Sequence, residues 1–123
     1  MHKISFKYFL FLVLLTFISC EEILMVDDIS KKEVSLTAPA NNAALSSTGI
    51  TFSWEVVEGA DKYQLQIASP SFDAPQQIIL DTLVTKNSYT QQLNIGKYEW
   101  RIRAVNSAYE TVYFKRSFEI LNN

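Results

Sequence analysis

The chain has 123 residues, of which 48% are hydrophobic and 20% charged, a composition typical of one globular domain. Its formal net charge of −2 leaves no basic excess, which argues against nucleic acid as a partner. The single His and the single Cys, His2 and Cys20, both fall near the amino terminus. The rest of the chain therefore lacks the commonest metal ligands and the commonest general base.

The first 19 residues have the three parts of a secretory signal peptide. Residues 1–7 are short and basic, residues 8–18 form an apolar run too short to span a bilayer stably, and the small Ser19 precedes Cys20. We therefore expect residues 1–19 to be removed. Two alternatives stay open, namely an ordinary signal peptide followed by an accidental Cys, and an uncleaved membrane helix.

The sequence Phe17-Ile18-Ser19-Cys20 resembles the lipobox of bacterial lipoproteins. The resemblance implies cleavage before Cys20, diacylation of its sulfur, acylation of its new amine, and membrane anchoring through fatty acyl chains such as palmitate. The two acidic residues that follow Cys20 are similar to surface-export signals of some Gram-negative lipoproteins. The expected location is the outer membrane, on its periplasmic side or at the cell surface.

Residues 20–33 show no clean hydrophobic period and carry charge pairs of opposite sign, Asp27-Asp28 and Lys31-Lys32. We expect a flexible, disordered tether here. About 13 residues in extended form reach roughly 45 Å, enough to hold a domain clear of the lipid headgroups.

From residue 34 onward, apolar and polar residues alternate in short runs separated by turn residues. Pro39 ends or interrupts the first run because it has no N–H for a central ladder, and Leu45 could continue that strand after a break. We predict strands at 34–37, 50–56, 63–67, 77–84, 88–92, 97–105 and 112–120. About seven short strands at intervals near ten residues are expected of a two-layer β-sandwich.

The run 97–105 has the clearest alternation, with large apolar residues on one face and charged residues on the other. The first set is Tyr98, Trp100, Ile102 and Ala104, and the second includes Glu99, Arg101 and Arg103. We expect the aromatic face to lie in the core and the charged face to meet water.

Three spaced motifs resemble a fibronectin type III domain: Phe52-x-Trp54, Gly59-Ala60-x-x-Tyr63-x-Leu65-x-Ile67, and Leu93-x-x-Gly96-x-Tyr98-x-Trp100-x-Ile102-x-Ala104-x-Asn106. The resemblance covers residues 34–120 and implies an all-β, seven-stranded, immunoglobulin-like β-sandwich, which we place at residues 34–121. It further implies that Trp54 and Tyr63 lie at the centre of the core. Leu93 and Tyr98 are expected to form the tyrosine corner of that family.

The outer face of the sheet formed by 63–67, 97–105 and 112–120 is one candidate binding surface. Amide, guanidinium and phenol groups there suit hydrogen bonding to a partner protein or a glycan. The candidate partner-binding residues are Gln64, Gln66, Arg101, Arg103, Tyr113 and Lys115, with Glu99 on the same face. The alternative is a solvated face whose charges pair weakly.

Phe72 and Tyr109 fall in predicted loops and are candidates for stacking on a sugar ring, although they could equally plug the ends of the sandwich. Arg116 interrupts an apolar face, so it requires a carboxylate or carbonyl partner or a bulge that changes the register.

We predict a non-catalytic outer-membrane lipoprotein, a binding or scaffold module that engages another cell-envelope protein. The alternative is a glycan-binding accessory protein of a polysaccharide-uptake system. This alternative rests on a similarity of Thr37-Ala38-Pro39-Ala40-Asn41 and the motifs above to amino-terminal domains of outer-membrane starch-binding lipoproteins, where the module is generally a spacer. We expect no catalytic residues, no metal, no cofactor and no nucleic-acid partner.

Overall fold

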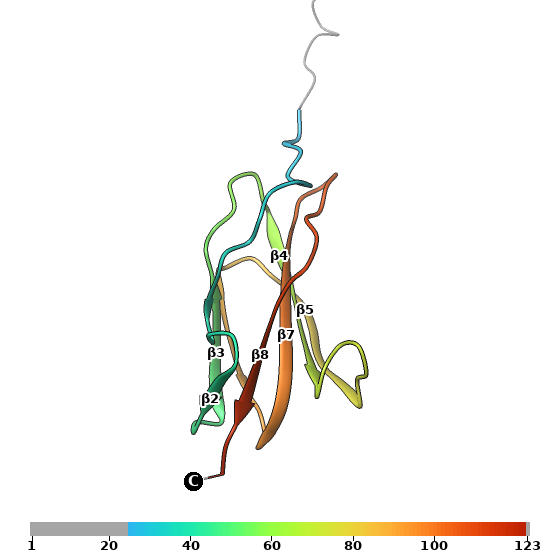
Figure 1. The fold of residues 1–123 in the computed structure, drawn as a ribbon. Coiled ribbons are helices and arrows are strands. Elements are labelled where there is room, and N and C mark those ends of the chain that lie inside the picture. Colours follow the sequence, from blue (N-terminus) through green and yellow to red (C-terminus); the bar gives the residue numbers. More distant parts are fainter. Residues whose placement is uncertain (1–24, 123) are drawn as a thin grey trace, which may run out of the picture.

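Alternating apolar side chains in the sequence become the inward faces of eight strands in the computed structural model, which describes residues 25–122. Figure 1 shows these strands as two facing layers. The strands are β1 (Leu36–Ala38), β2 (Ala43–Leu45), β3 (Gly49–Trp54), β4 (Lys62–Ser69), β5 (Gln77–Val84), β6 (Ser88–Gln92), β7 (Gly96–Val105) and β8 (Phe114–Ile120). No helix long and apolar enough to cross a membrane occurs within the described residues.

The strands form a three-stranded sheet in the order β1-β3-β6 and a five-stranded sheet in the order β2-β8-β7-β4-β5. Neighbouring strands are antiparallel except β2 and β8, which run parallel. The predicted strand at 77–84 is β5, and it forms one edge of the larger sheet beside β4. This arrangement leaves β7 and β4 in the interior of that sheet, where each strand pairs with a neighbouring strand along both of its edges.

The first predicted strand is divided between the two sheets. β1 pairs with β3 in one sheet, and after Pro39 the chain crosses to pair β2 with β8 in the other. Pro39 cannot donate to a ladder, which explains why the strand breaks there. The break and the return at Leu45 agree with the prediction and raise the strand count from seven to eight.

Aromatic rings from both sheets meet between the layers. The Phe52 ring lies 5.2 Å from that of Trp100 and 5.7 Å from that of Phe118, both edge-on. The rings of Trp54 and Tyr63 lie 5.6 Å apart. All five side chains are at most 4% exposed, so the predicted core roles of Trp54 and Tyr63 are confirmed.

The predicted tyrosine corner is present at the turn between β6 and β7. The hydroxyl of Tyr98 donates to the backbone carbonyl of Asn94 over 2.6 Å, and Leu93 beside it is buried. Tyr98 also stacks on Phe118 with ring centroids 5.3 Å apart. The corner fixes the path by which the chain enters β7.

The segment from Asp27 to Glu33 differs from the predicted disordered tether. Ile29 is fully buried and belongs to the hydrophobic core. The side-chain amide of Asn106 donates to the carbonyl of Asp27 over 2.8 Å, and the ammonium group of Lys32 donates to the carbonyl of Glu58 over 2.8 Å. Residues 27–33 are therefore held against the end of the sandwich, whereas Cys20 and the predicted signal peptide fall outside the described residues.

The last strand begins later than predicted, and Val112 lies before it with 68% of its surface exposed. Arg116 faces the same side as its cross-strand partner Trp100, as the alternation predicts. Its guanidinium donates to the backbone carbonyl of Pro39 over 3.3 Å, which is the carbonyl partner that an inward arginine requires.

Candidate interaction surface

The outer side of the five-stranded sheet brings six polar or aromatic side chains from four segments together. Register pairs Gln64 with Arg103 and Gln66 with Arg101 between β4 and β7, and each pair shares the outward face. Tyr113 approaches from the residue before β8, and Phe72 from the loop between β4 and β5. We name these side chains the arginine face, which consists of Gln64, Gln66, Phe72, Arg101, Arg103 and Tyr113.

Arg101 lies at the centre of the arginine face. Its guanidinium carbon is 4.2 Å from the centroid of the Phe72 ring and 4.2 Å from that of Tyr113. Its Nε donates to Oε1 of Gln66 over 2.7 Å. Two aromatic contacts and one hydrogen bond therefore hold this guanidinium in one orientation.

Arg103 lies two residues further along β7 and has different hydrogen-bond partners. Its Nε and Nη2 donate to Oε1 of Gln64 over 2.9 and 2.6 Å, and its Nη1 lies 3.2 Å from a carboxylate oxygen of Glu110. Gln64 in turn donates from Nε2 to Asp81 over 2.9 Å. Every nitrogen of the Arg103 guanidinium thus has a partner within the protein.

The Tyr113 ring contacts two guanidinium groups, with the guanidinium carbon of Arg101 at 4.2 Å and that of Arg103 at 4.6 Å from its centroid. Burial is the largest influence on its hydroxyl and raises the pKa of Tyr113 above 10.0, although the two arginines act in the opposite direction. Tyr113 is consequently neutral at physiological pH, and its ring serves as a cation–π partner.

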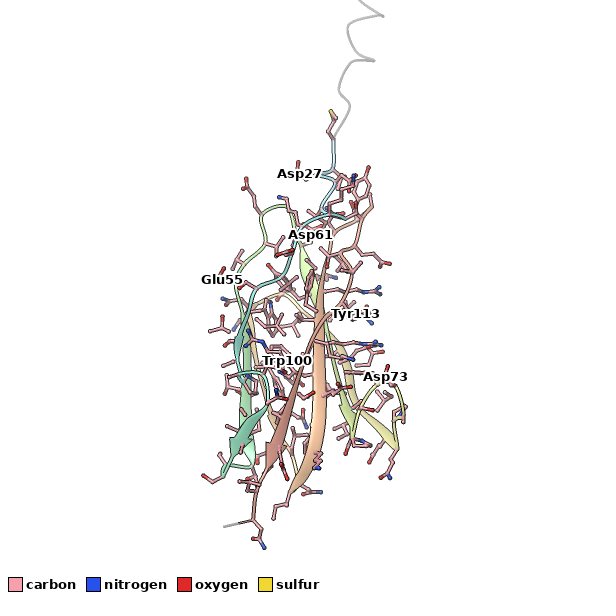
Figure 2. The ribbon with its side chains drawn as sticks, in the orientation of Figure 1. Asp27, Glu55, Asp61, Asp73, Trp100 and Tyr113 are labelled. Carbon is pink, nitrogen blue, oxygen red and sulfur yellow. The ribbon has the colours of Figure 1, made fainter. Side chains whose placement is uncertain are left out.

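Glu99 fastens the loop of Phe72 to the sheet. One of its carboxylate oxygens accepts the backbone N–H of Phe72 at 2.8 Å, and the other accepts the Ser117 hydroxyl at 3.3 Å and lies 3.6 Å from the ammonium of Lys115. Lys115 also lies 3.9 Å from the carboxylate of Asp73 in the same loop. Figure 2 shows Tyr113 and Asp73 on the same side of the sandwich.

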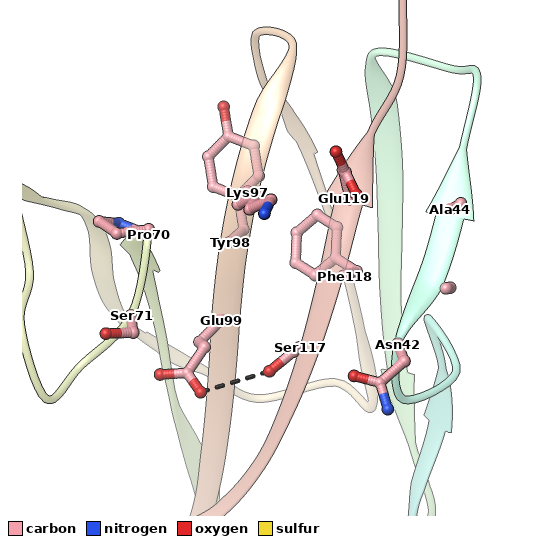
Figure 3. Close-up of a pocket in the computed structure, with 11 residues that line it drawn as sticks. Asn42, Ala44, Pro70, Ser71, Lys97, Tyr98, Glu99, Ser117, Phe118 and Glu119 are labelled. Atoms are coloured by element: carbon pink, nitrogen blue, oxygen red, sulfur yellow. Dashed lines mark hydrogen bonds between the residues drawn. The ribbon is translucent and has the colours of Figure 1, made fainter.

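A shallow depression lies next to Glu99, between the loop at Pro70 and Ser71 and the strand β2 (Figure 3). Its floor is formed by β7 and β8, and polar or charged groups line it, among them Lys97, Glu99, Ser117 and Glu119. The bond between Glu99 and Ser117 crosses this floor. The arginine face and the depression are therefore neighbouring parts of one surface.

The structure gathers all six predicted partner-binding residues, Gln64, Gln66, Arg101, Arg103, Tyr113 and Lys115, on this surface. The two predicted sugar-stacking residues do not meet. Phe72 contacts Arg101, whereas Tyr109 lies in the loop beyond β7 and pairs its backbone with Asn106, roughly 16 Å farther along the strand direction. The contact between Phe72 and Arg101 was not predicted, because the loop sequence carries no signal for the direction in which the loop folds.

Within the described residues, no group of three or more metal-ligating side chains occurs. What the arrangement offers chemically is pre-ordered hydrogen-bond donors beside aromatic and apolar surface. Such a surface is suited to recognition by contact.

Comparison with known proteins supports the fold. No protein-family model and no curated protein matches the chain. Among solved structures, it is similar to the fibronectin(III)-like modules of CbhA from Clostridium thermocellum, with 13% sequence identity and a TM-score of 0.52 over 72% of this chain and 95% of that chain. It is also similar to a fibronectin type III domain derived from the human KIAA0970 protein, with 11% identity and a TM-score of 0.52 over 72% of this chain and 73% of that chain.

Similarity at this level of identity establishes a shared fold and nothing more specific. The described residues form an all-β sandwich of the fibronectin type III kind, and the predicted fold class is confirmed.

Proposed function

We propose that this chain is a non-catalytic lipoprotein of the outer membrane, anchored through Cys20, whose sandwich binds another cell-envelope protein through the arginine face. The observation that carries the proposal is the array of contacts among Phe72, Arg101, Tyr113 and Arg103 on the outer side of the five-stranded sheet. Arginine and tyrosine are enriched among the residues that dominate binding energy at protein interfaces. Because these side chains are already ordered, little conformational entropy remains to be lost on binding.

The borders of the arginine face support a protein partner. Ile78 and Leu83 on the edge strand β5 are 51% and 57% exposed, and their register partners Ala68 and Gln64 place them on the outward side. Exposed aliphatic groups beside arginine and tyrosine match the composition of a protein interface.

The alternative, a glycan-binding accessory protein of a polysaccharide-uptake system, finds less support in the geometry. A sugar ring stacks on an open aromatic face, but Tyr113 is in contact with two guanidinium groups and Phe72 with one. Tyr109 is 39% exposed and stands apart. Retardation of the protein by a polysaccharide gel that is lost in Tyr109→Ala would favour this alternative, and Tyr109→Ala leaves the Phe72–Arg101 contact intact.

The proposed lipid anchoring is tested by measuring the intact mass of the protein isolated from its native envelope. We expect a chain that begins at Cys20 and carries the added mass of fatty acyl chains, and we expect Cys20→Ser to abolish membrane association. A chain that keeps residues 1–19, or that carries an unmodified Cys20 thiol, would contradict the proposal.

The interface is tested by photo-crosslinking in the producing cells, with a photoreactive residue at Leu83 on the outward side of the five-stranded sheet. The matched control position is Thr51, which is exposed on the opposite sheet and pairs there with Thr90. A discrete adduct of an envelope protein should form from position 83 and be absent from position 51. Equal labelling from both positions, or none from position 83, would contradict binding through this face.

A further inference from the structure

We propose that Arg101 is the specificity-determining residue of the arginine face, and that its two Nη groups bind a carboxylate of the partner protein. This inference rests on the proposed function and adds the chemical group that is recognised. It names one residue among several that the sequence places on the same face.

The hydrogen bonds of the two arginines differ in what they leave available. Arg103 uses its Nε, Nη1 and Nη2 on Gln64 and Glu110. Arg101 uses its Nε on Gln66, and its Nη1 and Nη2 have no hydrogen-bond partner among residues 25–122. A guanidinium has five N–H donors, so four donors of Arg101 remain for a ligand.

The ion pairs of the described residues also leave the guanidinium of Arg101 available for a ligand. None of the three ion pairs among the described residues includes Arg101. The nearby carboxylates are engaged elsewhere: Glu99 with Phe72, Ser117 and Lys115, Asp81 with Gln64, and Glu110 with Arg103. An incoming anion therefore meets a guanidinium that forms no ion pair with any carboxylate of the described residues.

The geometry favours a carboxylate as that anion. The planar fork of a guanidinium matches the two oxygens of a carboxylate in a bidentate pair. Phe72 and Tyr113 hold Arg101 at 4.2 Å each, so the fork is ordered before binding. The exposed Ile78 and Leu83 nearby would contact the aliphatic surroundings of an aspartate or glutamate, or of a chain end, on a protein.

The first test uses sodium acetate as the probe on the full chain purified in detergent, with isotope-labelled arginine observed by NMR. The Nε–H and Nη–H resonances of Arg101 should shift in acetate and stay in place in sodium chloride of equal ionic strength. Those of Arg103 should shift less, because its nitrogens are already bound. Equal shifts at the two arginines, or no shift at Arg101, would overturn the inference.

The second test measures the cross-link yield from position 83 in cells. Arg101→Lys keeps the charge but removes the fork, and should lower the yield roughly tenfold or more, since hydrogen bonds to charged groups are the stronger class. Arg101→Glu should abolish the adduct. Lys86→Glu, in the exposed turn between β5 and β6, makes the same change of charge and should leave the yield unchanged.

The outcomes separate this inference from the proposed function. Thermal unfolding first establishes that Arg101→Lys and Arg101→Glu are folded. If both variants then give the adduct from position 83 at full yield, the role of Arg101 is overturned and the proposed interface is retained. Absence of any adduct in the unmodified chain would remove the interface itself. Alginate is a polymer of uronic acids and therefore carries glycan carboxylates. If the unmodified chain is retained on immobilised alginate and Arg101→Lys is not, the group recognised is a glycan carboxylate, and the assignment of a protein partner is overturned.

Discussion

The Tyr98 hydroxyl makes one hydrogen bond, to the Asn94 carbonyl, at a position that is almost fully buried. Tyr98→Phe removes the donor and leaves the carbonyl without this partner, so we expect a loss of about 1 kcal/mol in the free energy of unfolding, measured by urea denaturation. Tyr113→Phe is the matched control, because the Tyr113 hydroxyl has no hydrogen bond among the described residues. A loss in Tyr113→Phe equal to that in Tyr98→Phe would contradict the role of the corner.

The same tyrosine predicts a decline of stability in alkali. Burial raises the pKa of Tyr98 above 10.0, although the hydrogen bond to Asn94 acts to lower it. Above about pH 10 the unfolded chain loses this proton while the folded chain keeps it, so stability is fully present below that pH and falls as pH rises through it. Urea midpoints measured between about pH 8 and pH 12 should fall less steeply in Tyr98→Phe than in the unmodified chain.

Gly59 is required by both its backbone and its neighbours. Its φ of +89° is strained for a residue with a side chain, and an added Cβ would lie 3.0 Å from Ile29 and 3.1 Å from Asp27. We expect Gly59→Ala to lower the free energy of unfolding by about 1–2 kcal/mol. Gly49→Ala is the control, since its Cβ would meet only the flexible amide of Gln92, and a change there of at most about 0.5 kcal/mol is expected.

At the scale of elements, the segment 27–33 behaves as part of the sandwich. Hydrogen bonds from the side chain and backbone of Ser30 to Asp28 lower the pKa of that carboxyl below 3.8, and a backbone bond from Lys32 to Ile29 closes the turn. This local structure presents Ile29 to the core, where its side chain is fully buried. The segment therefore stabilises the end of the sandwich through burial of an apolar side chain.

Trypsin tests this docking at Lys31 and Lys32. We expect the native protein to resist cleavage there, and we expect Ile29→Ala to lose about 2–5 kcal/mol of stability and to be cut rapidly. Met25→Ala is the control, because Met25 is 90% exposed. Rapid cleavage after these lysines in the unmodified chain would show that the segment is undocked in solution.

The strands and the core follow from the sequence because their signal is local and repeated. Alternation over 97–105 specifies which side chains enter the core, and a buried Tyr98 requires an acceptor within reach of its hydroxyl. The positions of Ile29 and Phe72 depend on how a terminal segment and a loop fold back onto the sandwich. A single apolar residue in such a segment forms no repeated pattern from which its position could be predicted. For the same reason Arg101 and Arg103 are equivalent in the sequence, and the partners contributed by the loops distinguish them.

At the scale of the whole molecule, the docked segment shortens the stretch of chain that would connect the proposed lipid anchor at Cys20 to the sandwich. With Asp27 held by Asn106, the residues from Cys20 to the sandwich can extend to about 25 Å rather than the 45 Å expected for a tether that ends at residue 33. The described amino-terminal segment enters at one end of the sandwich and the carboxyl terminus leaves at the other (Figure 1). The sandwich would thus be held close to the membrane by one end.

A rigid spacer tests this geometry. Insertion of ten prolines between Val26 and Asp27 adds roughly 31 Å of stiff chain, and should reduce the cross-link from position 83 if the partner stands at a fixed height in the envelope. A flexible Gly-Ser insert of the same length should retain more of the yield, because it can fold back. Full yield with the proline spacer would show that the partner is free to move away from the membrane.

The docking of Asp27 at the end of β7 would also determine the orientation of the arginine face relative to the membrane. If the chain is anchored as proposed, the strands would extend between the end nearest the membrane and the far end, and the outer faces of both sheets would stand perpendicular to the membrane. In such an arrangement Arg101 is presented neither to the lipid below nor to the medium above. Its counterpart would be a neighbour standing beside it in the same membrane.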